Sequence, residues 1–310
     1  MERFNAAIVD SLGTDNELLQ TVINYFLKAK GKQIRPMLVI LSARLFGEIN
    51  DSTVNAAVAV ELLHNASLIH DDVVDGSPLR RGRKTVNDVW DNRIAVLVGD
   101  YFVSCALKSA IMSGNKDVTD TIANLGKELA KGEIDQIETA DGHIIDEERY
   151  FRVIKQKTAS LFASCMRMGG VTNGATANEL DILYSFGEKL GLCFQIKDDI
   201  FDYFSDDKIG KPTGSDLKEG KVSLPLIYAL TNGRGEENDR MRALLSGNSL
   251  TDGQITELVA YAKEKGGIDY SVSVMEDLRN EANELISYFG NTPITTSLRD
   301  ILQFITVRTY

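Results

Sequence analysis

Residues 54–75 read VNAAVAVELLHNASLIHDDVVD, a run that is apolar on nearly every face of a helix until it ends in aspartates. A helix of this kind is a central one, because each of its faces must pack against another element. The segment KLGLCFQIKDDIFDYF at residues 189–204 repeats the pattern. Two such segments predict an all-α protein in which other helices surround the central ones.

Helical spacing of apolar residues continues along most of the chain. Proline, the residue that most strongly ends a helix, occurs five times and never between Leu79 and Lys211. No alternating pattern predicts a strand, and no linker rich in Pro, Gly or Ser divides the chain. We therefore expect a single all-α domain over residues 1–310, with helices at 18–27, 38–46, 54–74, 95–112, 122–137, 150–168 and 180–204.

Local signals predict where some of these helices begin and end. Thr14 with Glu17 forms a capping-box pattern, and Asp146 precedes two glutamates that would occupy a first turn. Gly169 and Gly170 are expected to end the helix that Asp146 begins.

Composition limits the class of protein. The 310 residues are 43% hydrophobic and 25% charged, and a net charge of −11 makes nucleic acid an unexpected partner because its phosphates would be repelled. Three cysteines without CxxC spacing predict buried free thiols in a reducing compartment. Neither a signal peptide nor a run of about 20 apolar residues is recognisable, so we expect a cytoplasmic protein without an integral membrane segment.

Two sets of aspartates share one spacing, DDVVD at residues 71–75 and DDIFD at residues 198–202. On a helix, the first and last aspartates of each set lie one turn apart on one face, where their charges repel. A divalent cation removes that repulsion, and oxygen ligands without a histidine or thiolate cluster favour Mg²⁺. A solvated acidic helix end explains one such motif well and two much less well. The predicted ligands are Asp71, Asp72, Asp75, Asp198, Asp199 and Asp202.

Basic residues supply the complement to these carboxylates. Lys32 and Arg35 lie in GKQIRP, the segment RRGRK follows the first aspartate set, and Lys157 with Thr158 interrupts an otherwise apolar helix. Metal and cations together form a diphosphate clamp, while apolar walls accommodate a hydrocarbon and exclude water. This combination favours ionisation of an allylic diphosphate. The P-loop, the dinucleotide fingerprint and the GxSxG elbow are all missing from the sequence.

Five ordered motifs then resemble a known family. They are GKQIRP, HNASLIHDDVVDGSPLRRGRKTVN, VLVGD, KTASLF and GLCFQIKDDIFDYFSDDKIGKPTGSDLKEGK. Together, between residues 31 and 221, they are similar to the trans-isoprenyl diphosphate synthases, most of all to the bacterial long-chain enzymes. The resemblance implies an antiparallel bundle of helices around a central cavity, of the isoprenoid synthase type, and a homodimer. It also implies a Mg²⁺-dependent prenyltransferase that condenses isopentenyl diphosphate with an allylic primer such as farnesyl diphosphate.

The resemblance assigns roles by position. Both aspartate motifs would hold Mg²⁺ on the allylic diphosphate. The positions that hold isopentenyl diphosphate match Lys32, Arg35, His64 and Arg81. Contacts to the allylic diphosphate match Arg80, Lys157, Lys211 and Lys221, and polar groups near the developing carbocation match Thr158 and Gln195. Lys157, Thr158 and Gln195 are therefore the expected catalytic residues.

Product length is the finer question. In the family, residues one helical turn before the first aspartate form a floor for the growing chain, and here they are Ala66 and Ser67, both small. Small residues predict a long all-trans polyprenyl product, near octaprenyl. The alternatives are a short-chain farnesyl or geranylgeranyl diphosphate synthase, a terpene cyclase, or the non-catalytic subunit of a two-component synthase. The spacing of DDIFD argues against a cyclase, and the presence of both aspartate sets argues against a silent subunit.

Overall fold

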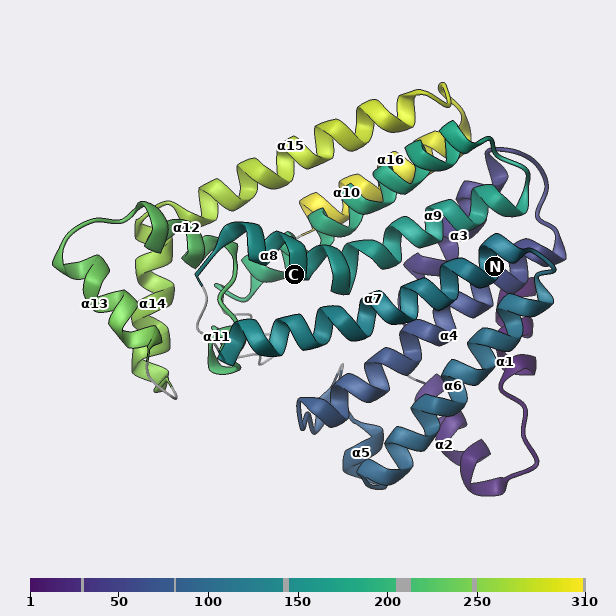
Figure 1. Ribbon diagram of the computed structural model, residues 1–310, viewed down its shortest axis with the longest axis horizontal. Coiled ribbons are helices and arrows are strands. Elements are labelled where there is room, and N and C mark those ends of the chain that lie inside the picture. The colour runs from purple at the N-terminus through teal and green to yellow at the C-terminus, as the bar shows by residue number, and fades with distance from the viewer. Residues whose placement is uncertain (29–30, 81, 142–144, 205–212, 247–249, 309–310) are drawn as a thin grey trace. The chain divides into compact units, whose positions relative to one another are not determined.

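The computed structural model describes residues 1–28, 31–80, 82–141, 145–204, 213–246 and 250–308, and over these ranges it is almost entirely helical (Figure 1). The all-α prediction is confirmed. The chain divides into two compact units, unit 1 with residues 1–127, 161–184 and 292–294, and unit 2 with residues 128–160, 185–291 and 295–310. Two long helices, α7 (Lys116–Asp141) and α10 (Ala177–Phe201), contribute to both. That the units act as one domain stays a prediction.

Unit 1 is built around α4 (Asp51–Val74), whose N-terminus is capped because the Asn50 side chain accepts a hydrogen bond from the Thr53 backbone N–H. Residues 56–60 are completely buried, as expected for a central helix. In this unit α4 packs against α6, α3 and α1, and it runs alongside α6 in Figure 1. The other helices of unit 1 are α1 (Glu2–Ser11), α2 (Glu17–Leu27), α3 (Ile34–Arg44), α5 (Val86–Val89), α6 (Asn92–Met112) and α9 (Ser160–Thr172).

Two predicted helix ends are wrong. The cap of α2 is Asn16, whose side chain accepts a hydrogen bond from the Leu19 backbone N–H, and not Thr14. Helix α9 also continues past Gly169 to Thr172. A Cβ at Gly169 would lie 2.2 Å from the backbone oxygen of Val39 in α3, so this glycine allows two helices to pack closely instead of ending one.

A short hairpin was not predicted. Strand β1 (Leu79–Arg80) pairs antiparallel with β2 (Arg83–Lys84), directly after the first aspartate motif. Gly82 in the turn has a φ of +72°, a left-handed conformation that glycine adopts without strain. Two-residue strands are too short to produce an alternating pattern, which explains why the sequence did not reveal them.

In unit 2, Asp146 caps α8 (Glu147–Ile154) as predicted, by accepting a hydrogen bond from the Arg149 backbone N–H at 2.6 Å. The single helix expected over residues 150–168 is instead interrupted. After Ile154 the backbone forms a π-helical turn, Lys155–Ala159, and α9 begins at Ser160. Such turns are rare and frequently occur at functional sites.

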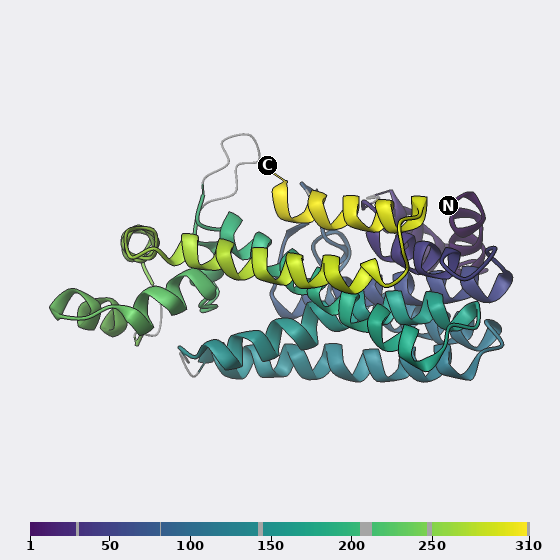
Figure 2. The same ribbon diagram turned by 90° about the horizontal axis from the view of Figure 1, so that it is seen from above.

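Among the remaining helices of unit 2, the four between residues 215 and 264 contribute to an apolar core in which Leu226, Leu230 and Leu258 are completely buried. A capping box at Thr251 and Gln254 begins α14. The last two helices, α15 and α16, run alongside each other in Figure 2. The elements are α11 (Ser215–Lys218), α12 (Leu224–Asn232), α13 (Glu236–Leu245), α14 (Asp252–Glu264), α15 (Gly267–Ser287) and α16 (Pro293–Val307).

The cysteine prediction concerns three side chains, and the membrane prediction concerns helix α6. Cys105, Cys165 and Cys193 are free and buried as predicted, and burial raises the pKa of the Cys193 thiol to about 12. Among the described helices, α6 is long and apolar enough to cross a membrane. However, 44% of its apolar window is buried within the structure, and the core helix of a soluble protein meets the same criteria.

Candidate active site

The first aspartate motif lies in unit 1 at the C-terminal end of α4. Asp71 and Asp72 occupy the last turn, and Asp75 is the residue at which the helix ends. Their surroundings differ, since Asp71 is half-buried, Asp72 is buried and Asp75 is exposed. The motif therefore presents carboxylates at the boundary between the core and solvent.

Asp72 connects the motif to the basic hairpin. Its Oδ1 accepts a hydrogen bond from Arg80 Nε at 2.8 Å, and its backbone oxygen accepts one from Asn87 Nδ2 at 3.2 Å. Burial raises the pKa of the Asp72 carboxyl, and the charge of Arg80 offsets part of that increase. Arg80, a predicted contact to the allylic diphosphate, is thus paired with the motif itself. Its neighbour Arg81 lies outside the described residues.

The hairpin is also held from the other side, by Tyr25 of α2. The Tyr25 hydroxyl donates a hydrogen bond to the backbone oxygen of Lys84 at 2.8 Å, and the Arg83 guanidinium lies 4.8 Å from the centre of the tyrosine ring. A cation over an aromatic face is attracted by the ring quadrupole. Tyr25, which the sequence analysis did not single out, therefore helps to fix the basic segment.

The predicted isopentenyl diphosphate residues that are described also lie in unit 1. Lys32 precedes α3 and Arg35 lies in its first turn, where the guanidinium is 5.2 Å from the centre of the Phe162 ring. His64 lies on α4 and is 8% exposed. Their common role as a binding site stays a prediction, as does that of the floor residues Ala66, which is buried, and Ser67, which is half-buried.

The second aspartate motif ends α10 in unit 2, and its middle carboxylate is almost enclosed. Asp199 is 5% exposed; its Oδ2 accepts a hydrogen bond from the Tyr150 hydroxyl at 2.6 Å and its Oδ1 accepts one from Gln195 Nε2 at 2.8 Å. Burial, with a further contribution from the Asp216 carboxylate, raises the pKa of Asp199 to about 7. Both carboxylate oxygens are therefore held by neutral donors from the protein.

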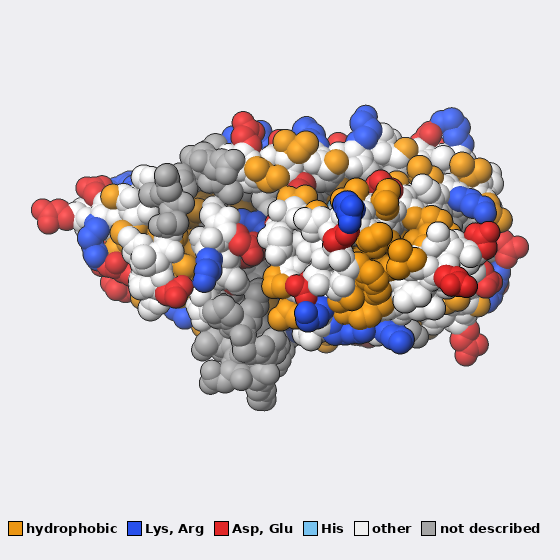
Figure 3. Space-filling view, turned by 90° about the horizontal axis from the view of Figure 1, so that it is seen from below, with side chains coloured by type: hydrophobic (Ala, Val, Ile, Leu, Met, Phe, Trp, Pro, Cys, Tyr) orange, Lys and Arg blue, Asp and Glu red, His pale blue; other side chains and the backbone are white. Residues whose placement is uncertain are grey.

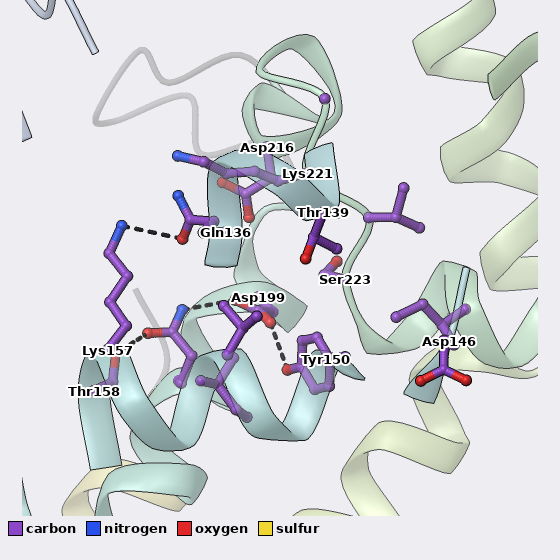
Figure 4. A pocket seen from close by; sticks show the side chains of 16 residues that line it. Gln136, Thr139, Asp146, Tyr150, Lys157, Thr158, Asp199, Asp216, Lys221 and Ser223 are labelled. Atoms are coloured by element: carbon purple, nitrogen blue, oxygen red, sulfur yellow. Dashed lines mark hydrogen bonds between the residues drawn. The ribbon is translucent and has the colours of Figure 1, made fainter. Parts of the chain in front are cut away.

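A pocket opens beside Asp199 and contains most of the predicted catalytic residues (Figure 4). Its empty volume is about 870 Å³, part of it open to solvent. Thr158 Oγ1 donates a hydrogen bond to Gln195 Oε1 at 2.8 Å, which completes a chain from Thr158 through Gln195 to Asp199. Lys157, from the same π-helical turn, donates to Gln136 Oε1 at 3.0 Å and forms an ion pair with Glu133 at 2.5 Å. The structure thus brings Lys157, Thr158, Gln195 and Asp199 together, and their roles in catalysis and metal binding stay predictions.

Lys221 and Asp216 line the other side of this pocket (Figure 4). Lys221 was predicted, and its ammonium also pairs with Glu219 at 2.6 Å. Lys211, predicted for the same diphosphate, lies outside the described residues. Asp216 was not predicted as a site residue, although it stands in the quoted motif GSDLKEGK.

Asp202, the third aspartate of the second motif, determines where Asp216 lies. Its Oδ1 accepts hydrogen bonds from the Ser215 backbone N–H and hydroxyl, and its Oδ2 accepts one from the Asp216 backbone N–H at 3.1 Å. In this arrangement the Asp202 carboxylate caps the short helix α11. Its role as a metal ligand stays a prediction.

Asp198, the first aspartate of the second motif, forms an ion pair with Arg308 near the end of the described chain. The guanidinium is 4.7 Å from the centre of the Phe194 ring and 5.3 Å from that of Phe201, and the side chain is 15% exposed. No local signal in the sequence placed Arg308 near an aspartate 110 residues earlier. A charged group beside two rings of α10 is well placed to hold Asp198 in its present orientation.

The donor chemistry of both motifs fits Mg²⁺, because carboxylate oxygens are its preferred protein ligands. Within the described ranges, no three His, Cys, Asp or Glu side chains are grouped so that they could hold a metal ion on their own. The two motifs fall in different units, so their facing one another stays a prediction. A metal held by one or two carboxylates from a motif, with diphosphate oxygens and water completing its shell, is consistent with this arrangement.

Comparison with known proteins agrees with this geometry. A sequence profile described as "Polyprenyl synthetase" matches residues 16–262, across both units. The octaprenyl diphosphate synthase of Escherichia coli K12 is 38% identical over 296 residues, 94% of this chain and 91% of that protein. Heptaprenyl diphosphate synthase component 2 of Geobacillus stearothermophilus is 35% identical over 292 residues, covering 92% of this chain and 88% of that protein.

Two solved structures extend the similarity to the fold. The decaprenyl diphosphate synthase of Rhodobacter capsulatus superposes with a TM-score of 0.93 at 33% identity, covering 100% of this chain and 96% of that one. The geranylgeranyl pyrophosphate synthase of Bacteroides thetaiotaomicron does so with a TM-score of 0.86 at 35% identity, covering 99% and 95%. Proteins similar to this chain thus carry names for both long and short products.

Proposed function

The chain belongs to the polyprenyl synthetase family, a family of prenyltransferases, and from that premise we propose that it elongates an allylic diphosphate with isopentenyl diphosphate to a long all-trans polyprenyl diphosphate. The observation that carries this proposal is the pocket of unit 2, in which Lys157 and Lys221 flank the chain of hydrogen bonds from Thr158 to Asp199. Cations beside carboxylates suit a diphosphate that is held through metal on one side and through ammonium groups on the other.

The residues of this pocket fit a departing diphosphate. Lys157 and Lys221 stabilise negative charge as the allylic C–O bond breaks and its electron pair leaves with the diphosphate. When bound at the aspartates, Mg²⁺ would supply further stabilisation of that charge. We expect the oxygens of Thr158 and Gln195, which are joined by a hydrogen bond in this pocket, to stabilise positive charge on the allylic carbon.

The new bond forms when the double bond of isopentenyl diphosphate attacks the allylic carbon. This leaves the positive charge on the isopentenyl unit. A proton then leaves the carbon next to that charge and goes to the released diphosphate, so the reaction demands no general base from the protein. This agrees with a chain that has only three histidines. The apolar residues Val153, Ile154 and Ile227 line the same pocket and help to exclude water from the cation.

Long product length is the finer part of the proposal. It is supported by the names of curated relatives, which include octaprenyl and nonaprenyl diphosphate synthases, and by the small residues Ala66 and Ser67. The geranylgeranyl name of a solved structure at 35% identity makes a short product the alternative to test. We expect Ala66→Phe and Ser67→Phe to shorten the product. Ser67→Thr, which adds little volume, is the matched control.

The decisive experiment incubates the purified chain with Mg²⁺, labelled isopentenyl diphosphate and farnesyl diphosphate, and separates the dephosphorylated alcohols. A narrow band of long prenols supports the proposal. Geranylgeraniol as the final product would replace it with the short-chain alternative, and cyclised hydrocarbon would replace it with a terpene cyclase. Unchanged product length in Ala66→Phe and Ser67→Phe would remove the floor assignment alone.

We also propose that the enzyme is a cytoplasmic homodimer. Helix α6 exposes several large apolar side chains, among them Leu97 (64%), Ile111 (66%) and Met112 (64%), and Figure 3 shows hydrophobic side chains gathered on one face of the molecule. Exposed apolar patches commonly mark interfaces between chains. The similarity to a synthase component 2 makes a different partner chain the alternative. Elongation by the purified chain alone, eluting at twice its mass, supports the homodimer; activity that needs a second protein contradicts it.

A further inference from the structure

Two residues without a role in the proposed function meet beside the first aspartate motif. His70 directly precedes Asp71, and Gly99 lies in the segment VLVGD on α6. A Cβ at position 99 would lie 2.2 Å from His70 Nε2, 2.5 Å from Cδ2 and 2.9 Å from Cε1. The imidazole therefore rests directly on the backbone of α6, and any side chain at position 99 would have to displace it.

The ring is held there by polar contacts. His70 Nε2 lies 3.3 Å from the backbone oxygen of Val96 and 3.4 Å from Asp100 Oδ1. A carbonyl oxygen only accepts hydrogen bonds, so Nε2 carries the proton and donates it. Val96 and Asp100 are one helical turn apart, on either side of Gly99 in the sequence. The segment VLVGD thus holds His70 in place, with a hydrogen-bond acceptor at each end and, between them, a glycine that leaves room for the ring.

Because the contact between His70 and α6 lies next to the first aspartate motif, it can affect how the last turn of α4 is oriented. His70 and Asp72 are two residues apart, which on an α-helix separates their side chains by about 200°. The last turn of α4 is therefore tied on nearly opposite sides, to α6 through His70 and to the hairpin through the pair of Asp72 with Arg80. Asp71 lies between these two ties, so they fix the direction in which its carboxylate extends.

We propose that His70, seated on Gly99, is a positioning residue that sets the rotation of the last turn of α4 and thereby aims Asp71 at the allylic diphosphate. This rests on the proposed function. Misplacing a reacting or binding group by about 1 Å costs on the order of 100-fold, and loss of a supporting contact around a metal ligand costs about 10- to 100-fold. Lys32, Arg35 and His64, the described residues predicted to hold isopentenyl diphosphate, are on other turns or other elements, so its binding should change little.

The test compares Gly99→Ala, His70→Ala and the double variant. We expect each single variant to raise the KM for the allylic diphosphate about tenfold and to leave the KM for isopentenyl diphosphate within about twofold. Because the three atoms nearest to the added methyl group all belong to the imidazole, the double variant should be no worse than His70→Ala alone. His70→Gln, which keeps an N–H donor, should restore part of the loss. Gly126→Ala is the matched control, because the nearest atom to its Cβ is 4.0 Å away.

Several outcomes would overturn the proposal. If the increases in KM caused by Gly99→Ala and His70→Ala multiply in the double variant, the two residues act independently and Gly99 is not there to accommodate His70. If both substrates lose affinity equally, or if only the melting temperature changes, His70 is a packing residue and positions nothing. The stability coupling between positions 70 and 99 is measurable without any substrate, so a failure of the proposed function itself would be recognised separately, by wild-type protein that elongates no primer.

Discussion

The third aspartates of the two motifs meet different surroundings. Asp75 is exposed at the end of α4, whereas its counterpart Asp202 is 7% exposed and accepts three hydrogen bonds from Ser215 and Asp216. The middle aspartates differ as well. Asp72 faces a cation, Arg80, while Asp199 is held by the neutral donors of Tyr150 and Gln195.

Two motifs with the same aspartate spacing therefore make different structural contacts. In the first motif, Asp71 and Asp75 lie nearer to solvent than the buried Asp72, and the hairpin and His70 hold the turn that carries them. In the second motif, Asp202 accepts the hydrogen bonds that position the Ser215–Asp216 segment, and Asp199 ends the chain of hydrogen bonds in the pocket. We therefore expect substitutions of Asp71 and Asp75 to affect activity alone and those of Asp199 and Asp202 to affect stability too.

The largest expected effect concerns the first aspartate of each motif. Asp71→Asn and Asp198→Asn should each lower kcat/KM by about 100-fold or more, because each removes a charge on which the diphosphate site depends. Initial rates with farnesyl and isopentenyl diphosphates at fixed Mg²⁺ measure this. Asp120→Asn on the surface of α7 is the control for a lost carboxylate. Near-normal activity in either variant would exclude that motif from the site.

The third aspartates give the next largest effect, on stability. Asp202→Ala should lower the free energy of unfolding by about 2–4 kcal/mol, since it leaves two backbone N–H groups and a hydroxyl without their acceptor. Asp75→Ala should change it by less than about 0.5 kcal/mol, as for most exposed positions. Urea denaturation of the two variants measures the difference. Equal losses would show that the burial of Asp202 has no energetic consequence.

Sequence alone identified several of the residues that line the pocket of unit 2. Of the residues that the aspartate spacing and the KTASLF motif identified, Asp199, Lys157 and Thr158 line one pocket, whereas Asp198 pairs with Arg308. The spacing identified these residues because a carboxylate pair on an apolar helix needs an explanation within a few residues, and their roles in binding and catalysis stay predictions. The π-helical turn under Lys157 gave no signal, because its composition is that of an α-helix.

The partners of those residues could not be predicted. Tyr150 and Arg308 each meet an aspartate that is distant in sequence, 49 and 110 residues away respectively, so no local pattern connects them. Gly99 lies in the motif VLVGD, but the sequence does not show why a glycine is needed there. The contact of α6 with His70 explains it, because a side chain at position 99 would collide with the imidazole. Local chemistry marks which residues act, whereas the contacts that hold them depend on packing between elements.

Asp199 should make the stability of the protein depend on pH. Its pKa is raised from 3.8 to about 7 by burial, so the folded state binds a proton that the unfolded state releases across this interval. Stability is therefore highest below about pH 4 for this group and falls as pH rises toward 7, by at most about 1.4 kcal/mol per pH unit. Asp199→Asn should remove that slope in Mg²⁺-free urea denaturation between pH 5 and pH 8. An unchanged slope would assign it to other groups.

The smallest expected effect belongs to Arg308. Without metal or substrate, Arg308→Gln should lower the free energy of unfolding by about 1 kcal/mol, because the ion pair with Asp198 is partly shielded by Phe194 and Phe201 but still reached by solvent. With saturating Mg²⁺ and diphosphate, the difference should shrink, since Asp198 would then have another cation as its partner. Lys189→Gln, which removes the ion pair with Glu281 away from the motif, is the control and should show the same loss under both conditions. If the loss in Arg308→Gln persists at saturation, Asp198 stays paired with Arg308 while the site is filled. The second motif would then bind through Asp199, whose hydrogen bonds with Tyr150 and Gln195 must first break.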